Sequence, residues 1–445
     1  MRIPRVLLCS IPIWTALIFT AMPAEIPKLP EPYQTLAELA RGAPPEIAAS
    51  ALLRIVEQGR LADQDVRRDL IEEAFRNAAA ARFPVRMQGL PGTNGDTASG
   101  SLSRAYALKL DVLSLQSRAV RDMLPVDPAV ARHLFGEIAR PELSPLTCDD
   151  ALFYDLSDFY EALSAVVAST FTQKERAKDA HLIFLTDYLG VAASPLEAAP
   201  LAQVIQNAGV TAQQRQGLWA GLSGLLENVR TDDRSFSASL PALNSLRIPE
   251  MQASLEKYRS KNHGCQGDSI SPPGPSKNAA PAVKNTSTPK FDPYWQSPAA
   301  QQLLQAGKKL RFDRNNMPLS EADRSTPEWQ QQVADYLNQI AGWTADQESS
   351  EADYYHEKCI VLTALIELVP PGPLTDKLLA DYVDFIGNSD LYRQSPAEWF
   401  LEPWALLDRL QTNRIILAKI RNAYQISGNP VLNLEIALDK TRGRQ

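Results

Sequence analysis

Residues 65–81, DVRRDLIEEAFRNAAAA, show the pattern that decides the fold class. Apolar side chains recur in this stretch every four residues: Val66, Leu70, Ala74 and Ala78. At 3.6 residues per turn this spacing places them on one face of a helix, with the pairs Arg67-Arg68 and Glu72-Glu73 toward solvent. A strand would instead alternate apolar and polar residues at every second position. The stretch therefore predicts an amphipathic helix with one buried face.

The same helical spacing continues along the chain on both sides of this stretch. Before residue 266 it predicts helices near 45–59, 103–124, 128–139, 148–169, 173–189, 195–207, 212–229 and 249–261. After residue 294 it predicts helices near 359–369, 374–387, 396–411, 413–426 and 430–440, with helix starts at Ser297-Pro298, Thr326-Pro327 and Ser395-Pro396. Hydroxyl residues cap helix N-termini and proline suits the first turn, and Ser395 with Glu398 fits a capping box. No alternating strand pattern of useful length competes with these helices.

Many short helices in succession predict an all-α fold built from antiparallel helical hairpins. We expect an irregular array of the α-solenoid or partial α/α toroid type. The chain shows no strict repeat period, and the tetratricopeptide pattern is absent from it.

The composition changes sharply at residues 267–293, which hold six prolines among Ser, Thr, Asn, Lys and Ala. This stretch has too few large apolar residues to bury a core, so it predicts a disordered linker spanning roughly 30 Å. The chain is thus expected to have an N-terminal helical domain at 25–266 and a C-terminal one at 294–445.

The first twenty-four residues resemble a secretory signal. Arg2 and Arg5 precede an uncharged, mostly apolar run from Val6 to Ala21, and Ala24 follows where a signal peptidase could cut. The run is interrupted by Pro12 and is shorter than the ~20 residues that span a bilayer. We therefore expect an exported protein, periplasmic or secreted, with an uncleaved N-terminal anchor as the alternative.

Composition limits the class of partner. The chain of 445 residues is 44% hydrophobic, which is sufficient for two or three buried cores. Its formal net charge of −7 becomes −9 once residues 1–24, with two arginines and no acid, are removed. The densest basic run is only Lys308, Lys309, Arg311 and Arg314, which is typical of a solvated helix end. Nucleic acid is therefore a poor candidate partner.

Three cysteines follow the signal, and an odd number in an exported chain suggests one disulfide and one free thiol. Cys359 begins an apolar helical run and should be buried. Cys148 and Cys265 lie beside turn residues and are the disulfide candidates, closing a loop of 117 residues worth about 4 to 5 kcal/mol. Free thiols, or a bridge that uses Cys359, are the alternatives.

Motifs for nucleotides and metals are incomplete. Gly95 to Gly100 has the glycine spacing of a phosphate-binding loop, but Ser101 stands where that loop needs lysine, and no strand precedes it. His356 and Cys359 could face one metal, but Cys359 falls on the apolar face of its helix, so core packing is the better interpretation. No cofactor, metal site or catalytic residue set is predicted.

An acidic and aromatic segment begins at Cys148 and contains Asp155 and Asp158. If both lie on one helical face, a paired-carboxylate site for glycan hydrolysis is conceivable, with His181 as a third residue to test. Acids early in a helix also interact favourably with its positive end, and this structural role is the preferred interpretation.

Tryptophan is concentrated after the linker, at positions 295, 329, 343, 399 and 404. Such rings can stack on sugars or anchor a protein partner. Trp399 and Trp404 are the candidates for an exposed binding surface.

The first functional hypothesis is an exported, non-catalytic helical-repeat protein that acts as an interaction scaffold for a protein or peptide. The second is a periplasmic or secreted glycan-directed enzyme on a helical toroid. The third is a small-molecule or glycan-binding module that uses the C-terminal aromatic residues.

Overall fold

The computed structural model describes residues 29–31, 33–58, 61–89, 98–140, 142–147, 150–228, 234–246, 248–260, 298–345 and 350–442. Within these residues the prediction of an all-α protein is confirmed, because helices dominate and the named strands form one small sheet. The signal at 1–24 and the linker at 267–293 lie outside the described residues and stay predictions.

The N-terminal region, residues 29–260, is mainly helical. Its helices are α1 (Tyr33–Arg41), α2 (Pro45–Gln58), α3 (Gln64–Ala78), α4 (Ala98–Ala107), α5 (Val112–Met123), α6 (Pro128–Glu137), α7 (Ser157–Ser169), α8 (Gln173–Arg176), α9 (Ala180–Val191), α10 (Pro195–Asn207), α11 (Ala212–Asn228), α12 (Ser235–Ser245), η1 (Pro249–Met251) and α13 (Gln252–Ser260). Its strands are β1 (Met87–Gly89) and β2 (Leu152–Tyr154).

The C-terminal region, residues 298–442, is also built mainly of helices. Its helices are α14 (Pro298–Arg311), α15 (Glu321–Arg324), α16 (Pro327–Gly342), α17 (Glu351–Leu368), α18 (Pro373–Asn388), α19 (Leu391–Gln394), α20 (Pro396–Arg409), η2 (Leu410–Thr412), α21 (Arg414–Ser427) and α22 (Pro430–Arg442).

Side-chain caps start several of the helices. The Asp63 carboxylate accepts hydrogen bonds from the first turn of α3, and Ser194 and Glu197 form a reciprocal capping box at α10. The Thr326 hydroxyl caps α16 as predicted. The predicted box at α20 is wrong: the helix does begin at Pro396, but the Ser395 hydroxyl is buried and makes no capping hydrogen bond.

Three predicted helices are divided in the structure. The stretch 103–124 becomes α4 and α5, because Lys109 adopts a left-handed φ of 56° and the Asp111 side chain caps a new helix. Asp179, at φ 57°, likewise separates α8 from α9. Residues 152–154 of the stretch 148–169 form β2, and α7 starts only at Ser157. Apolar spacing alone did not show these breaks, because a left-handed residue or a three-residue strand changes the backbone torsions and not the apolar pattern.

The sheet is a short antiparallel pair in which Met87 faces Tyr154 and Gly89 faces Leu152. Three residues per strand are too few for an alternating pattern, which explains why periodicity did not predict it. A small hydrophobic cluster forms beside the sheet and includes Met87, Tyr106, Leu146 and Leu152. The sheet packs against α4, and α4 in turn contacts α20 of the C-terminal region.

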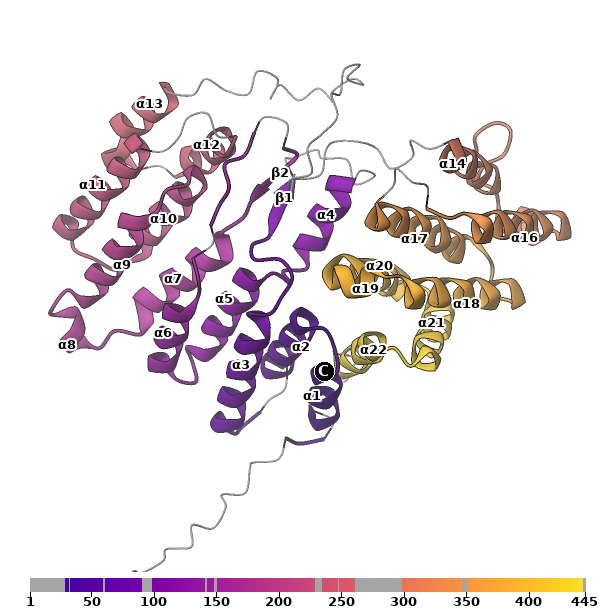
Figure 1. The fold of residues 1–445 in the computed structure, drawn as a ribbon, viewed down its shortest axis with the longest axis horizontal. Coiled ribbons are helices and arrows are strands. Elements are labelled where there is room, and N and C mark those ends of the chain that lie inside the picture. Colours follow the sequence, from indigo (N-terminus) through magenta and orange to yellow (C-terminus); the bar gives the residue numbers. More distant parts are fainter. Residues whose placement is uncertain are drawn as a thin grey trace, which may run out of the picture.

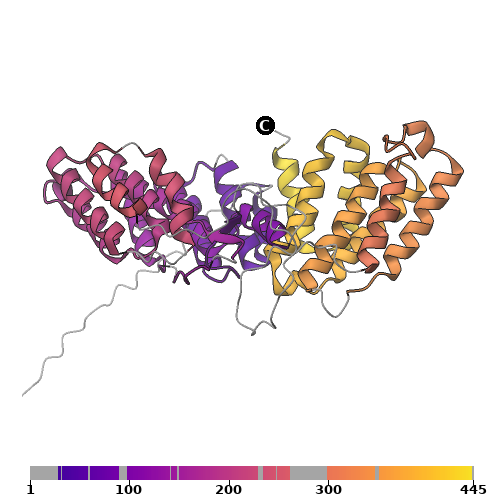
Figure 2. The same ribbon diagram turned by 90° about the horizontal axis from the view of Figure 1, so that it is seen from above.

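The helices follow an open arc in Figure 1, from α13 at one end to α14 at the other. The first described helix, α1, lies near the middle of the arc and contacts α22 from the other end of the described chain. Neighbours along the arc contact each other, as in α2 with α3, α5 with α7 and α18 with α21. Figure 2 shows the two regions as arms of an elongated molecule that meet at this middle.

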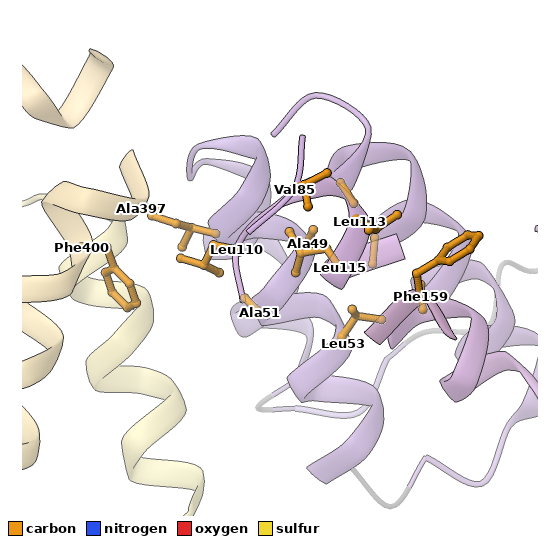
Figure 3. Close-up of a cluster of buried hydrophobic side chains, with 14 of the residues drawn as sticks. Ala49, Ala51, Leu53, Val85, Leu110, Leu113, Leu115, Phe159, Ala397 and Phe400 are labelled. Carbon is orange, nitrogen blue, oxygen red and sulfur yellow. The ribbon is translucent and has the colours of Figure 1, made fainter. Parts of the chain in front are cut away.

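Both apolar packing and a buried ion pair hold the two regions together. Ala397 and Phe400 of α20 lie beside Leu110 and Ala51 in Figure 3, and one hydrophobic cluster includes all four. Next to them, α2 and α22 are joined by Arg54 and Glu435, whose guanidinium and carboxylate make two hydrogen bonds of 2.8 and 3.2 Å. The core is therefore continuous across the junction.

Two helical glycines predict opposite stability changes on replacement by alanine. A methyl group at Gly217 would meet nothing within 4 Å, so Gly217→Ala should raise the free energy of unfolding by about 0.5 to 1 kcal/mol through helix propensity. A methyl group at Gly307 would lie 2.7 Å from the Tyr336 hydroxyl, which is buried and donates to the Leu303 carbonyl. Gly307→Ala should therefore lower that free energy by about 1 kcal/mol net. Urea denaturation of both variants measures the difference, and equal effects would contradict this packing.

Gly217 and Gly221 lie four residues apart on α11, a spacing of small residues that can let two helices approach closely. Gly217 is exposed, and the nearest atom to a methyl group at Gly221 would be a Leu189 carbon of α9 at an ordinary 3.8 Å. These glycines therefore do not mediate a tight helix contact.

Candidate functional site

Asp155 and Asp158 are brought together by an arginine. Asp155 precedes α7 and Asp158 lies in its first turn, so they do not share a helical face as expected. The Arg86 guanidinium, from the residue before β1, lies 2.8 Å from the Asp155 carboxylate and 3.2 Å from that of Asp158. It also donates to the Ser157 hydroxyl at 2.6 Å. Pairing of β1 with β2 positions Arg86 for these contacts.

Further donors occupy the Asp158 carboxylate, which is only 3% exposed. One oxygen accepts from Lys109 at 2.9 Å and from Arg121 at 3.3 Å, and the other accepts from the Ser114 hydroxyl at 3.2 Å. Burial alone would raise the pKa of Asp158, but the Lys109 hydrogen bond and the three nearby positive charges outweigh it and lower the pKa. Asp158 is therefore an ionised anchor of a charge network.

His181 lies far from these carboxylates. Its buried ring contacts Phe171, beyond the C-terminal end of α7, with ring centroids 6.2 Å apart. Asp158 is in the first turn of the same helix, which places it about 20 Å away along the axis. Burial and the positive charge of Arg176 lower the pKa of His181. The three residues therefore do not assemble into one site.

A charged pocket of about 430 Å³ opens beside Asp158. Its polar lining comes from α2, α5, α7 and the turn after α4: Glu57, Lys109, Ser114, Arg118, Arg121, Asp122 and Asp158. Arg118 binds Glu57 through two hydrogen bonds of 2.7 and 2.6 Å. Among these residues only Asp158 is a candidate from the sequence, because the others come together through the packing of separate helices.

Asp122 is the unusual group of the charged pocket. One of its carboxyl oxygens is buried and has no hydrogen-bond partner. Burial, reinforced by the negative charge of Glu57, raises its pKa to about 7, although Arg118, Arg121 and Arg67 oppose the shift. Asp122 can therefore take up or release a proton near neutral pH.

We predict that Asp122→Asn stabilises the protein at neutral pH. Between the ordinary pKa of 3.8 and the folded value of about 7, the folded protein keeps a proton that the unfolded chain has released. Asp122 thus lowers stability as pH rises through this window, by up to about 4 kcal/mol. The asparagine variant should have the same melting temperature as the parent near pH 4 and a higher melting temperature at pH 8. Equal melting temperatures at pH 8 would contradict the raised pKa.

A second pocket, of about 320 Å³, lies between α7, the start of α10 and the segment after α6. We call it the aromatic pocket, since Phe159 and Tyr160 line it together with Leu156, Val191, Arg140 and Glu197. The Tyr160 hydroxyl donates to Glu197 at 2.7 Å, and burial followed by the Glu197 charge raises the pKa of Tyr160. The Arg140 guanidinium stacks 4.3 Å from the centroid of the Tyr188 ring and pairs with no described carboxylate. This pocket combines an apolar floor with the Arg140 guanidinium and the carboxylates of Glu142 and Glu197.

Trp399 does not form a binding surface. It is fully buried, its indole nitrogen donates to the Ile386 carbonyl at 2.8 Å, and its ring packs edge-on against Tyr392. The expectation of an exposed ring is therefore corrected: an indole has large apolar area, and α20 turns this area into the core. Trp404 is half-buried and packs against the same core.

His356 and Cys359 of α17 both lie inside the C-terminal region. His356 binds the Glu402 carboxylate of α20 at 2.9 Å, and both side chains are 2% exposed. Cys359 is buried as predicted, and burial followed by the Glu402 charge raises its pKa far above the ordinary value. His356 and Glu402 thus form an inter-helix hydrogen bond within the core. Among the described residues, no three His, Cys, Asp or Glu side chains are grouped to hold a metal ion.

Some sequence predictions fall outside the described residues. Cys148 and Cys265 are both among these, so their disulfide stays a prediction, as does the conformation of Gly95. The basic run on α14 is exposed, as expected for a solvated helix end. No helix in the described ranges is long and apolar enough to cross a membrane.

Comparison with known proteins assigns no family to the chain. No protein-family model matches it. No curated protein sequence matches it either. The fold and the site geometry therefore define its class directly, as an all-α protein with a charged pocket and an aromatic pocket.

Proposed function

We propose that this protein is an exported, non-catalytic interaction scaffold whose helical hairpins form a solenoid-like or partly toroidal arc. The observation that carries the proposal is the state of Asp158, the carboxylate best placed for chemistry. Both of its oxygens are occupied by Lys109, Arg121, Arg86 and Ser114, and a nucleophile or general base needs an accessible lone pair. The strongest acidic candidate thus stabilises the fold.

The aromatic pocket is the proposed contact for a peptide partner. It offers apolar surface from Leu156 and Phe159, and the Arg140 guanidinium can bind a carboxylate. The neighbouring outer face of α9 exposes Ile183 and Val191, at 61% and 60%. Large apolar side chains exposed next to a pocket are typical of interaction surfaces. The partner is therefore expected to insert an apolar side chain and to place an acidic group beside Arg140.

Site-specific photocross-linking tests this proposal. A photoreactive residue at Val191 should capture a discrete protein adduct in the exported fraction, and Arg140→Ala should reduce the yield at least tenfold. An apolar peptide with a terminal carboxylate should compete with the adduct. The matched control is Ile426, which is 76% exposed on α21 in the other arm and should give no such adduct. Equal adducts at both positions, or adducts indifferent to Arg140, would overturn the proposal.

A scaffold also needs a stable junction between its arms, which Arg54 and Glu435 support. Their side chains are only 13% and 8% exposed, so Glu435→Ala leaves a guanidinium poorly solvated and should lower the free energy of unfolding by about 2 to 3 kcal/mol. The control is Glu367→Ala, since its pair with Arg409 is about 40% exposed and should contribute under about 1 kcal/mol. Urea denaturation compares them, and equal losses would contradict the structural role of the junction pair.

A glycan-directed hydrolase is the second candidate, favoured by one observation. Asp122 lines the charged pocket, and its pKa, raised to about 7, suits a general acid near neutral pH. Release of reducing ends from soluble glycans by the purified protein, abolished in Asp122→Asn, would favour this function over the scaffold.

A further inference from the structure

Three cationic side chains line the charged pocket. Arg118 and Arg121 are one helical turn apart on α5, and Lys109 lies in the turn that precedes this helix. Each side chain has hydrogen-bond donors beyond those that bind its carboxylate partner. The Lys109 ammonium uses one of its three hydrogens to bind Asp158. The guanidinium groups of Arg118 and Arg121 each have at least one N–H that binds no carboxylate. A ligand with several acceptor oxygens can bind these donors together.

The backbone at Lys109 indicates that its position has a role. Its φ of 56° is in the left-handed region, which glycine adopts readily and lysine does not. Strained residues of this kind are concentrated at binding sites, where the surrounding structure holds them. The side chain is about half exposed and lies at the pocket, so it is accessible to a ligand.

Asp122 supplies the second, independent observation. Its buried oxygen lacks a partner, although the groups facing it are Glu57 from α2, Arg67 from α3, and Arg118 and Arg121 on its own helix. A protonated carboxyl group can donate a hydrogen bond to an anion. With Asp122 neutral, the pocket lining carries three positive and two negative charges, which favours an anionic over a cationic ligand.

We propose that the charged pocket binds a small oxyanion, held by Lys109, Arg118 and Arg121, with the Asp122 carboxyl group in the same pocket lining. Phosphate and carboxylate ligands share this chemistry. The site is separate from the aromatic pocket proposed for the peptide partner, so either proposal can fail alone.

Isothermal titration calorimetry with sulfate tests the site, because sulfate stays a dianion from pH 6 to 8. Binding should weaken about tenfold over this range, as the fraction of protonated Asp122 falls around its pKa of about 7. Asp122→Asn, whose amide donates at every pH, should bind sulfate with no such dependence. Absence of binding at millimolar sulfate, or an unchanged pH dependence in Asp122→Asn, would overturn the proposal.

Lys109→Gly is the variant that separates binding from folding, because glycine adopts the same backbone conformation without strain. It should remain folded and lose at least tenfold in sulfate affinity. Asn316→Gly is the matched control, since Asn316 also has a left-handed φ, of 62°, but lies in the C-terminal region. Equal affinity in both variants would contradict the site. Parallel titrations with inorganic phosphate and with citrate then compare the two ligand classes. Tighter binding of phosphate indicates a phosphate ligand, and tighter binding of citrate indicates a carboxylate ligand.

Discussion

Asp158→Ala is expected to lower the free energy of unfolding by about 3 kcal/mol at pH 7. The substitution removes the shared partner of Arg86, Lys109 and Arg121. Arg86 is only 13% exposed and keeps Asp155 as its remaining carboxylate partner, whereas Lys109 and Arg121 are more exposed and recover part of the loss through hydration. Chemical denaturation followed by circular dichroism measures this change.

The control for Asp158 is Glu161→Ala on the same helix. Glu161 pairs with Arg121 as well, but it is 60% exposed, so its removal should change stability by less than about 1 kcal/mol. The pKa of Asp158 is lowered on folding, so its stabilisation is complete above the ordinary value of 3.8 and is lost as pH falls below it. The difference in free energy of unfolding between the variant and the parent should therefore become small in acid. A loss that persists unchanged at pH 2 would contradict the ion-pair explanation.

Glu402→Ala is expected to lower the free energy of unfolding by about 3 to 5 kcal/mol, because it breaks a fully buried pair and leaves a cavity. Its carboxylate is the partner of His356 Nδ1, and the other imidazole nitrogen, Nε2, has no partner. In this variant the buried His356 imidazole would have no hydrogen-bond partner at either nitrogen. Urea denaturation at pH 7 tests the expected loss.

The control for Glu402 is Glu402→Gln, which keeps the shape and an acceptor oxygen for His356. Because the glutamine side chain keeps the hydrogen bond and fills the same volume, this variant should lose about 1 kcal/mol or less. If alanine and glutamine variants lost the same stability, the hydrogen bond to His356 would contribute nothing and the prediction would be wrong.

Helical periodicity predicted the elements but not all of their limits. The apolar faces of α2 and α3 are buried as expected, and the Pro-initiated helices α16 and α20 start at the predicted residues. The sequence pattern does not predict the break at Lys109, because the break depends on backbone torsion, which apolar spacing does not report. Nor does it predict the charged pocket, whose residues come from four separate segments without a motif.

The all-α class follows from the amino-acid sequence alone, because amphipathic spacing and N-terminal caps are local properties of a few consecutive residues. The burial of Cys359 follows in the same way from the apolar face on which this residue lies. Three properties instead arise from packing between distant segments: Trp399 is internal, Arg86 joins Asp155 to Asp158, and one buried oxygen of Asp122 has no hydrogen-bond partner. These properties depend on contacts between distant segments, and the periodicity of apolar residues within a helix does not specify which other helix it packs against.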